Sequence, residues 1–252
     1  FTIKIEPNQV DSGRSWIKKD ANTLYGWYTG MAYLLPILGG LIADKLIGTH
    51  RSMVVGGLLI ALGHIVLGLS GLGEMALNNS GMSVFVAGLA LITIGTGLLW
   101  FGWFGFNGGS ALSSGELATY AFTSTHFGAA AGGFAWGLMD KILRGKVGLV
   151  GVCIGIVVGL VAVTPGAGFV SAGSGLLIGA VGSIAANFCA YLRSKSQLDD
   201  SLDVFACHGV GGFVGTLMTG LLCSKSINPA GANGGIDQFV IQLKAGLAVA
   251  VY

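Results

Sequence analysis

The sequence predicts an all-α, polytopic membrane protein, a bundle of about eight transmembrane helices. Three features support this fold class. Hydrophobic residues make up 53% of the chain and charged residues only 10%, whereas soluble domains carry about 25% charged residues. Glycine contributes 45 of 252 residues without the three-residue period of collagen, and glycine lets helices approach closely in lipid. The third feature is a series of long apolar runs, which excludes intrinsic disorder.

Eight of these runs approach the roughly 20 residues that a spanning helix needs. They cover residues 27–43, 52–73, 82–106, 119–139, 147–164, 174–192, 204–223 and 239–252. Residues 1–20 are polar and are expected to lie outside the membrane. Because the sequence starts at Phe1 and stops within an apolar run, we expect it to be a fragment.

The basic residues of the short loops predict the orientation of the helices. Loops 44–51, 140–146 and 193–203 each carry Lys or Arg and should face the cytoplasm. Two spans separate the last two loops, which places them on one side. Three spans separate the first two loops, which places these on opposite sides. The conflict falls on run 82–106, and either one loop is an exception to a statistical rule or two topologies are joined.

The sequence lacks the patterns of an enzyme. It contains no GxSxG, HExxH, paired CxxC or phosphate-binding Gly-Lys motif. The four cysteines lie in apolar runs and are expected to be free thiols. The formal net charge of +2 comes from scattered residues and does not form a basic patch. We therefore predict no catalytic residue, cofactor, metal or nucleic-acid partner.

The N-terminal part carries a motif in loop 44–51 and its preceding residues. Within Gly39–Arg51, Asp44 can cap a helix end or pair with a cation, and Arg51 can anchor at the cytoplasmic interface. The loop resembles the one between helices two and three of major facilitator transporters; alone, it also fits an ordinary membrane turn. Residues Leu24–Tyr28, Tyr33–Pro36 and Ala90–Gly97 resemble the proton-coupled oligopeptide transporter family. The resemblance covers about residues 21–97.

The C-terminal part, from about residue 98 to 252, resembles another family. Three motifs carry this resemblance: Trp100–Ser110, Thr164–Val170 and Asp199–Gly212. They are similar to hallmarks of the ammonium transporter/Rh channel family, from its sixth helix to the start of its eleventh. The two resemblances meet at Gly95–Leu99, within the run that carries the topology conflict. We therefore predict a chimera of two membrane proteins, as an assembly artefact or a gene fusion.

The candidate site centres on His208, which lies in an apolar, glycine-rich run. An ionisable residue within the membrane indicates function, although a lone His can also be a hydrogen-bonded packing residue. The resemblance implies that His208 is one of two pore-lining imidazoles; the family's other His lies on a fifth helix that the chain lacks. It also places Ser110 at an external recruitment site, with Trp103 and Phe106 lining or packing near the pore. Each aromatic face returns about 0.5–2 kcal/mol to a desolvated cation.

Asp203 precedes His208 by five residues. It either caps the helix or lies at the cytoplasmic entrance of the pore. The resemblance implies passage of ammonium or ammonia across a plasma (inner) membrane, a homotrimer with one pore per subunit, and a P-II-type regulatory protein at the cytoplasmic face. Two alternatives remain: proton-coupled oligopeptide symport, from the N-terminal resemblance, and a hybrid without transport function.

Overall fold

The computed structural model describes residues 48–72, 79–198, 200 and 203–251. These residues form α2 (Thr49–Leu69), α3 (Asn79–Gly109), α4 (Glu116–Arg144), α5 (Leu149–Val163), the 3-10 turn η3 (Thr164–Gly166), α6 (Ala172–Arg193), the π-helical segment η4 (Phe205–Val210), α7 (Gly211–Leu222) and α8 (Ile236–Val251). Each of the seven predicted spans after the first overlaps a helix. The first predicted span, Asp44 and the polar N-terminal segment lie outside the described residues.

Among the described residues, five helical segments are long and apolar enough to cross a membrane. They are Arg51–Leu69, Gly81–Gly109, Leu149–Gly166, Ala172–Arg193 and Phe205–Leu222. Helices α4 and α8, which match two further predicted spans, are not among these five. Helix α4 is rich in Ser and Thr and ends in charged residues, and α8 has only 16 residues. The described part is thus an all-helical, membrane-type fold with fewer candidate spans than the eight expected.

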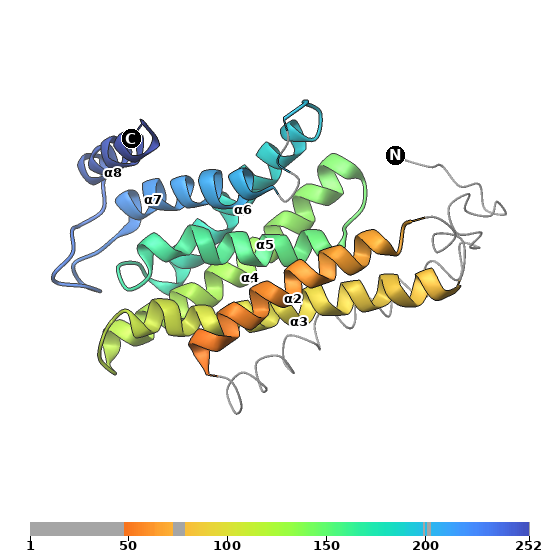
Figure 1. The fold of residues 1–252 in the computed structure, drawn as a ribbon. Coiled ribbons are helices and arrows are strands. Elements are labelled where there is room, and N and C mark those ends of the chain that lie inside the picture. Colours follow the sequence, from red (N-terminus) through yellow and green to blue (C-terminus); the bar gives the residue numbers. More distant parts are fainter. Residues whose placement is uncertain (1–47, 73–78, 199, 201–202, 252) are drawn as a thin grey trace.

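Helices α2 and α3 lie side by side and antiparallel (Figure 1). A Cβ at Gly56 would stand 2.7 Å from the carbonyl oxygen of Gly95, and one at Gly63 would stand 2.8 Å from that of Gly88. The seven-residue spacing in both helices keeps these glycines on one face, so the two backbones touch. Helix α3 continues without a break through Gly95–Leu99, where the sequence predicted a junction between two proteins.

A second closely packed group contains α4, α5 and α6. A Cβ at Gly132 in α4 would overlap the backbone of Gly155 and Gly159 in α5, and one at Gly179 in α6 would overlap the backbone of Gly128 in α4. Two clusters of buried apolar side chains complete the packing of this group, one between α4, α5, α6 and η4 and the other between α5, α6 and the turn that joins them. The clusters are built from Trp136, Val158, Ala186, Ala190, Ala206 and Cys207, and from Ala162, Val163, Val170 and Ile178.

The alternating helices define two ends of the bundle (Figure 1). One end holds the C-terminus of α4 and the α6–η4 loop, and therefore both basic loops 140–146 and 193–203. The opposite end holds the C-terminus of α3 and the start of α2, where Arg51 is exposed. The three-helix separation counted from the sequence is thus present in the fold, and Arg51 lies at the end opposite the other basic loops.

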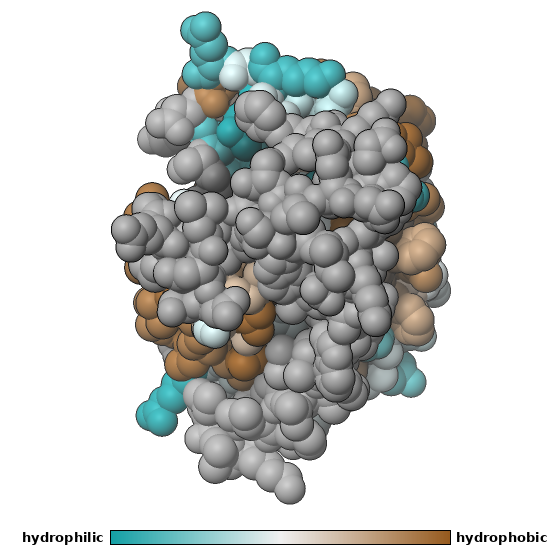
Figure 2. All heavy atoms as spheres, turned by 90° about the vertical axis from the view of Figure 1, so that its right-hand side faces the viewer, coloured by the Kyte–Doolittle hydropathy of each residue, from teal (hydrophilic) through white to brown (hydrophobic). Residues whose placement is uncertain are grey.

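The outer surface of the bundle exposes many large apolar side chains. Examples in three helices are Leu58, Ile65, Phe134, Ile142 and Phe188. Figure 2 shows hydrophobic atoms on both flanks of the molecule and hydrophilic atoms toward its upper and lower margins. A bilayer is the solvent in which such apolar surface is stable.

Candidate functional site

Three predicted site residues form one ridge near the C-terminal end of α3. Trp103 and Phe106 meet edge to face, with ring centroids 6.0 Å apart. Ser110 follows the helix directly, and its hydroxyl donates a hydrogen bond to the carbonyl oxygen of Phe106 at 2.5 Å. The spacing of three and four residues places them above one another on a helix. Phe106 is 49% exposed, so the ridge presents an aromatic face and a hydroxyl oxygen with free lone pairs.

The hydroxyl of Thr164 is hydrogen-bonded to the side chain of Trp103. It accepts a hydrogen bond from Trp103 Nε1 at 2.7 Å and one from Asn107 Nδ2 at 3.3 Å, and it donates to the carbonyl oxygen of Leu160 at 2.7 Å. Asn107 Nδ2 also donates to the hydroxyl of Thr125 in α4 at 2.9 Å. This network links α3, α4 and the end of α5, and it fixes the plane of the indole ring.

Sequence reasoning missed most of this network. It named Thr164 only as the first residue of the motif Thr164–Val170, and the structure places a 3-10 turn at Thr164–Gly166. Asn107 and Thr125 were not singled out. The available signal was the polarity of Thr125 within run 119–139 and of Asn107 directly after run 82–106, since polar groups buried in a membrane protein require partners.

His208 lies near the other end of the bundle, in the π-helical segment η4. Its neighbours Ala206 and Cys207 are buried against α5 and α6, whereas His208 and Gly209 are exposed. π-Helical turns are rare and frequently occur at functional sites. The structure therefore directs His208 away from the packed core, at the end opposite the ridge of Trp103, Phe106 and Ser110.

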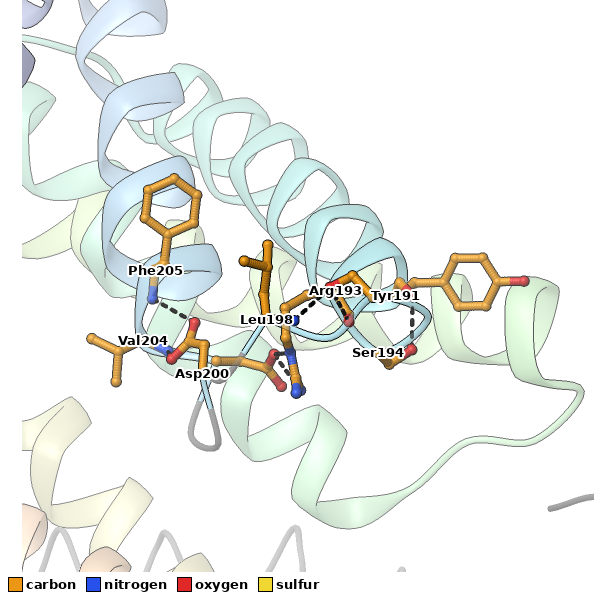
Figure 3. A network of polar contacts seen from close by, with 9 residues as sticks. Tyr191, Arg193, Ser194, Leu198, Asp200, Val204 and Phe205 are labelled. Carbon is orange, nitrogen blue, oxygen red and sulfur yellow. Dashed lines mark hydrogen bonds and ion pairs between the residues drawn. The ribbon is translucent and has the colours of Figure 1, made fainter.

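The approach to His208 differs from the expected helix cap. Asp200, not Asp203, accepts the first backbone N–H groups: its Oδ1 accepts from Val204 N and its Oδ2 from Phe205 N, both at 2.9 Å (Figure 3). The Asp203 carboxylate instead binds the guanidinium of Arg193, which donates from Nε at 2.9 Å and from Nη2 at 2.8 Å. Asp203 itself has a left-handed backbone, with φ at 52°, and cannot extend the helix backward.

The other histidines have different surroundings. His64 Nδ1 lies 2.8 Å from the carbonyl oxygen of Ile60 within α2. The His126 ring in α4 lies against Trp100, with centroids 5.3 Å apart, and near Phe104 at 6.0 Å. The side chain of His126 is therefore part of an aromatic contact between α3 and α4.

A polar group that the sequence analysis did not identify joins α4 to α6. Asp140 pairs with Arg144 one turn later, with Nη1 and Oδ1 2.5 Å apart, and Asn187 Nδ2 donates to the same oxygen at 2.9 Å. Arg144 Nη1 also donates to Asn187 Oδ1 at 2.9 Å. The i, i+4 spacing of Asp140 and Arg144 was the available signal. Within the described ranges, no group of three His, Cys, Asp or Glu could hold a metal ion.

Comparison with known proteins relates the chain to transporters. The sequence model of the Ammonium Transporter Family matches residues 53–252. An ammonium transporter of Aquifex aeolicus is 39% identical over 194 residues, which cover 75% of this chain and 46% of the relative. Ammonium transporter 2 of Schizosaccharomyces pombe is 49% identical over 131 residues, covering 52% of this chain and 26% of the relative.

A solved structure gives the same result. Saccharomyces cerevisiae Mep2 superposes with a TM-score of 0.59 and 40% sequence identity, covering 64% of this chain and 38% of Mep2. The chain thus spans less than half the length of these relatives.

These comparisons also bear on the predicted junction. The family match includes residues 53–97, whereas the motifs had indicated ammonium-transporter character only from Leu98. Neither the match nor the continuous helix α3 supports an oligopeptide-transporter segment in that range. From residue 53 onward, this chain belongs to the Ammonium Transporter Family.

Proposed function

We propose that the chain supplies the His208-bearing part of a transmembrane path for ammonium or ammonia. The observation that carries this proposal is the position of His208: a titratable ring in a π-helical turn that faces away from the protein core. Within a membrane protein, an outward-facing polar ring needs a water-filled or substrate-filled space. The family membership of residues 53–252 names the substrate.

The mechanism we propose uses both ends of the bundle. The ridge of Trp103, Phe106 and Ser110 recruits the cation, since aromatic faces attract it and the Ser110 oxygen accepts one of its N–H bonds. The ion transfers its proton to the neutral imidazole of His208, and the ammonia that remains passes on. An imidazole is suited to this step because it can donate or accept at neutral pH.

The orientation follows from the basic residues. Lys141, Arg144, Lys146, Arg193 and Lys195 all lie at the end of the bundle near His208. We place this end in the cytoplasm and Ser110 outside. In the same proposal the membrane is the plasma (inner) membrane, the assembly is a homotrimer, and a P-II-type regulator binds the cytoplasmic end. Chemical cross-linking of the protein in its native membrane tests the assembly.

The test is uptake into liposomes by a hybrid transporter in which residues 53–252 replace the matching part of a full-length family member. We expect methylammonium uptake that His208→Ala changes in rate and selectivity. His126→Ala is the matched control, because the His126 ring packs against Trp100. Unchanged rate and selectivity in His208→Ala would overturn the proposed role of His208.

The same assay, applied to the 252-residue chain, separates the alternatives predicted from the sequence. Dipeptide uptake driven by a proton gradient would favour oligopeptide symport. A stably folded chain that takes up neither dipeptide nor methylammonium would favour a hybrid without transport function. Methylammonium uptake alone would favour the ammonium path.

A further inference from the structure

We propose that Arg193, Asp203 and Asp200 are positioning residues that set the orientation of the His208 ring. This inference deepens the proposed function and rests on it, because it assigns control of a ring to which that function gives the central role. It starts from a mechanical requirement. A π-helical turn holds about one residue more than an α-helical turn, so a change between the two rotates the following side chains by about 100°.

The first contact that fixes the π-helical turn is the carboxylate of Asp200. Its two oxygens each accept one backbone N–H, from Val204 and Phe205, so both acceptors are used at the first residues of the turn (Figure 3). The first N–H groups of a helix have no partner inside it. A carboxylate that binds two of them holds the start of η4 in one rotational position.

The second contact ties the same start to a neighbouring helix. Arg193 is the last residue of α6, and its Nε and Nη2 both donate to Asp203 Oδ1. The carbonyl oxygen of Asp203 in turn accepts from Cys207 N at 2.8 Å, one residue before His208. The chain of contacts therefore runs from the end of α6, through the side chain and backbone of Asp203, to the residue adjoining the imidazole.

The ion pair of Arg193 and Asp203 restricts the geometry at the start of η4. Its side chains are 28% and 20% exposed, so the pair is partly buried, and the guanidinium is held against one carboxylate oxygen of Asp203. The planar guanidinium fork restricts the direction of approach more than a lysine would. The left-handed backbone of Asp203, with φ at 52°, also favours Asp or Asn over other residues with a side chain.

Packing on the other side of η4 completes the device. Ala206 and Cys207 are buried against Trp136 and the α5–α6 core, so this face of the turn is fixed by packing while its start is fixed by the polar contacts. At the end of η4, a Cβ at Gly211 would come within 3.2 Å of Val158. The polar contacts hold one end of the turn and this close approach holds the other, which leaves one direction for His208.

The substitutions that test this are Asp203→Asn and Arg193→Gln, alone and together. Asn keeps the left-handed backbone favourable and removes only the charge. Lys195→Gln is the matched control: it removes a positive charge from the same loop, but Lys195 lies over the Tyr191 ring, 4.1 Å from its centroid. Arg193→Lys keeps the charge and removes the fork.

Two measurements on the 252-residue chain in bilayers need no transport. We expect the ring resonances of His208 to shift in nuclear magnetic resonance spectra of both single variants. We also expect the amides of Val204 and Phe205 to exchange hydrogen about tenfold faster, with no further change in the double variant. Lys195→Gln should leave both unchanged. Unshifted His208 resonances in the two single variants would overturn the positioning role whatever the transport result.

The transport readout is the ratio of methylammonium to ammonium uptake in the hybrid transporter. Loss of folded protein lowers both rates and leaves the ratio unchanged. We expect the two single variants to change the ratio several-fold, within the hundredfold that a misplacement of 1 Å can cost, and Arg193→Lys to restore it in part. An altered ratio in His208→Ala with a normal ratio in Asp203→Asn would overturn the positioning role alone. A normal ratio in His208→Ala would overturn the proposed function.

Discussion

Replacing Thr164 with valine tests whether the three hydrogen bonds of its hydroxyl stabilise the end of the bundle near Ser110. Valine has nearly the same shape as threonine, so the change removes the hydroxyl without opening a cavity. The structure gives this hydroxyl bonds to Trp103 Nε1, Asn107 Nδ2 and the Leu160 carbonyl oxygen at 2.7, 3.3 and 2.7 Å. Asn107 keeps its bond to Thr125 at 2.9 Å, so the main loss is the acceptor of the indole N–H.

The expected cost follows from that one stranded donor. Leaving a buried donor without an acceptor costs about 1–3 kcal/mol. Hydrogen bonds between membrane helices average about 0.6 and reach about 1.7 kcal/mol. Because Trp103 is half-buried, we expect Thr164→Val to lower the free energy of unfolding by about 1–2 kcal/mol.

The assay is unfolding in mixed detergent micelles, followed by circular dichroism and arranged as a double-mutant cycle with Trp103→Phe. Phenylalanine has no N–H group, so Thr164→Val leaves no donor without an acceptor when Trp103→Phe is already present. In that variant Thr164→Val should cost about 1 kcal/mol less. Thr216→Val is the matched control, because that half-buried hydroxyl bonds Gly212 within its own helix. If the effects of the two substitutions are additive within about 0.3 kcal/mol, the Thr164 hydroxyl does not stabilise the protein through the Trp103 indole, and the reasoning is refuted.

Two further substitutions test the packing of the bundle. Gly95→Ala should destabilise the α2–α3 pair by about 1–3 kcal/mol through overpacking, because its Cβ would lie 2.6 Å from the Gly56 carbonyl oxygen. Gly57→Ala, with open space around it, is the control and should be neutral or stabilising. Equal effects of the two substitutions would contradict this packing. Asp140→Ala should cost about 2–3 kcal/mol in the same unfolding assay, below the 3–5 of a fully buried pair, because the Arg144 side chain is 33% exposed. Asp237→Ala, at the exposed first turn of α8, should leave stability unchanged, and a stability loss as large as that of Asp140→Ala would argue against a specific role for the α4–α6 group.

The sequence predicted the helical class and the approximate place of seven helices, because long apolar runs have one solution in a bilayer. The expectation that loops 44–51, 140–146 and 193–203 all face the cytoplasm conflicted with the three spans counted between the first two, and in the fold Arg51 does lie at the end opposite the other basic loops. The interpretation of that conflict as a junction at Leu98 is not supported, since α3 is continuous there and the family match begins at residue 53.

The polar contacts of the site were harder to predict. Thr164 and Trp103 lie 61 residues apart in the chain, and their bond depends on the crossing of α3 and α5. Asp200 and Asp203 have the same side chain and lie three residues apart, and only the backbone conformation at Asp203 decides which of them caps the turn. Spacing fixes which residues share a helix face, but it does not fix contacts across helices.

The most direct test of the central claim, that His208 contacts the transported species, is an ammonium titration of its ring signals. The protein is labelled with ¹⁵N at histidine and reconstituted in bilayers as the hybrid transporter, and potassium serves as the control cation at equal ionic strength. We predict a saturable shift of the His208 signals with ammonium, absent with potassium and absent from His126 under both. His208 signals that stay unchanged, or respond equally to both cations, would contradict the account.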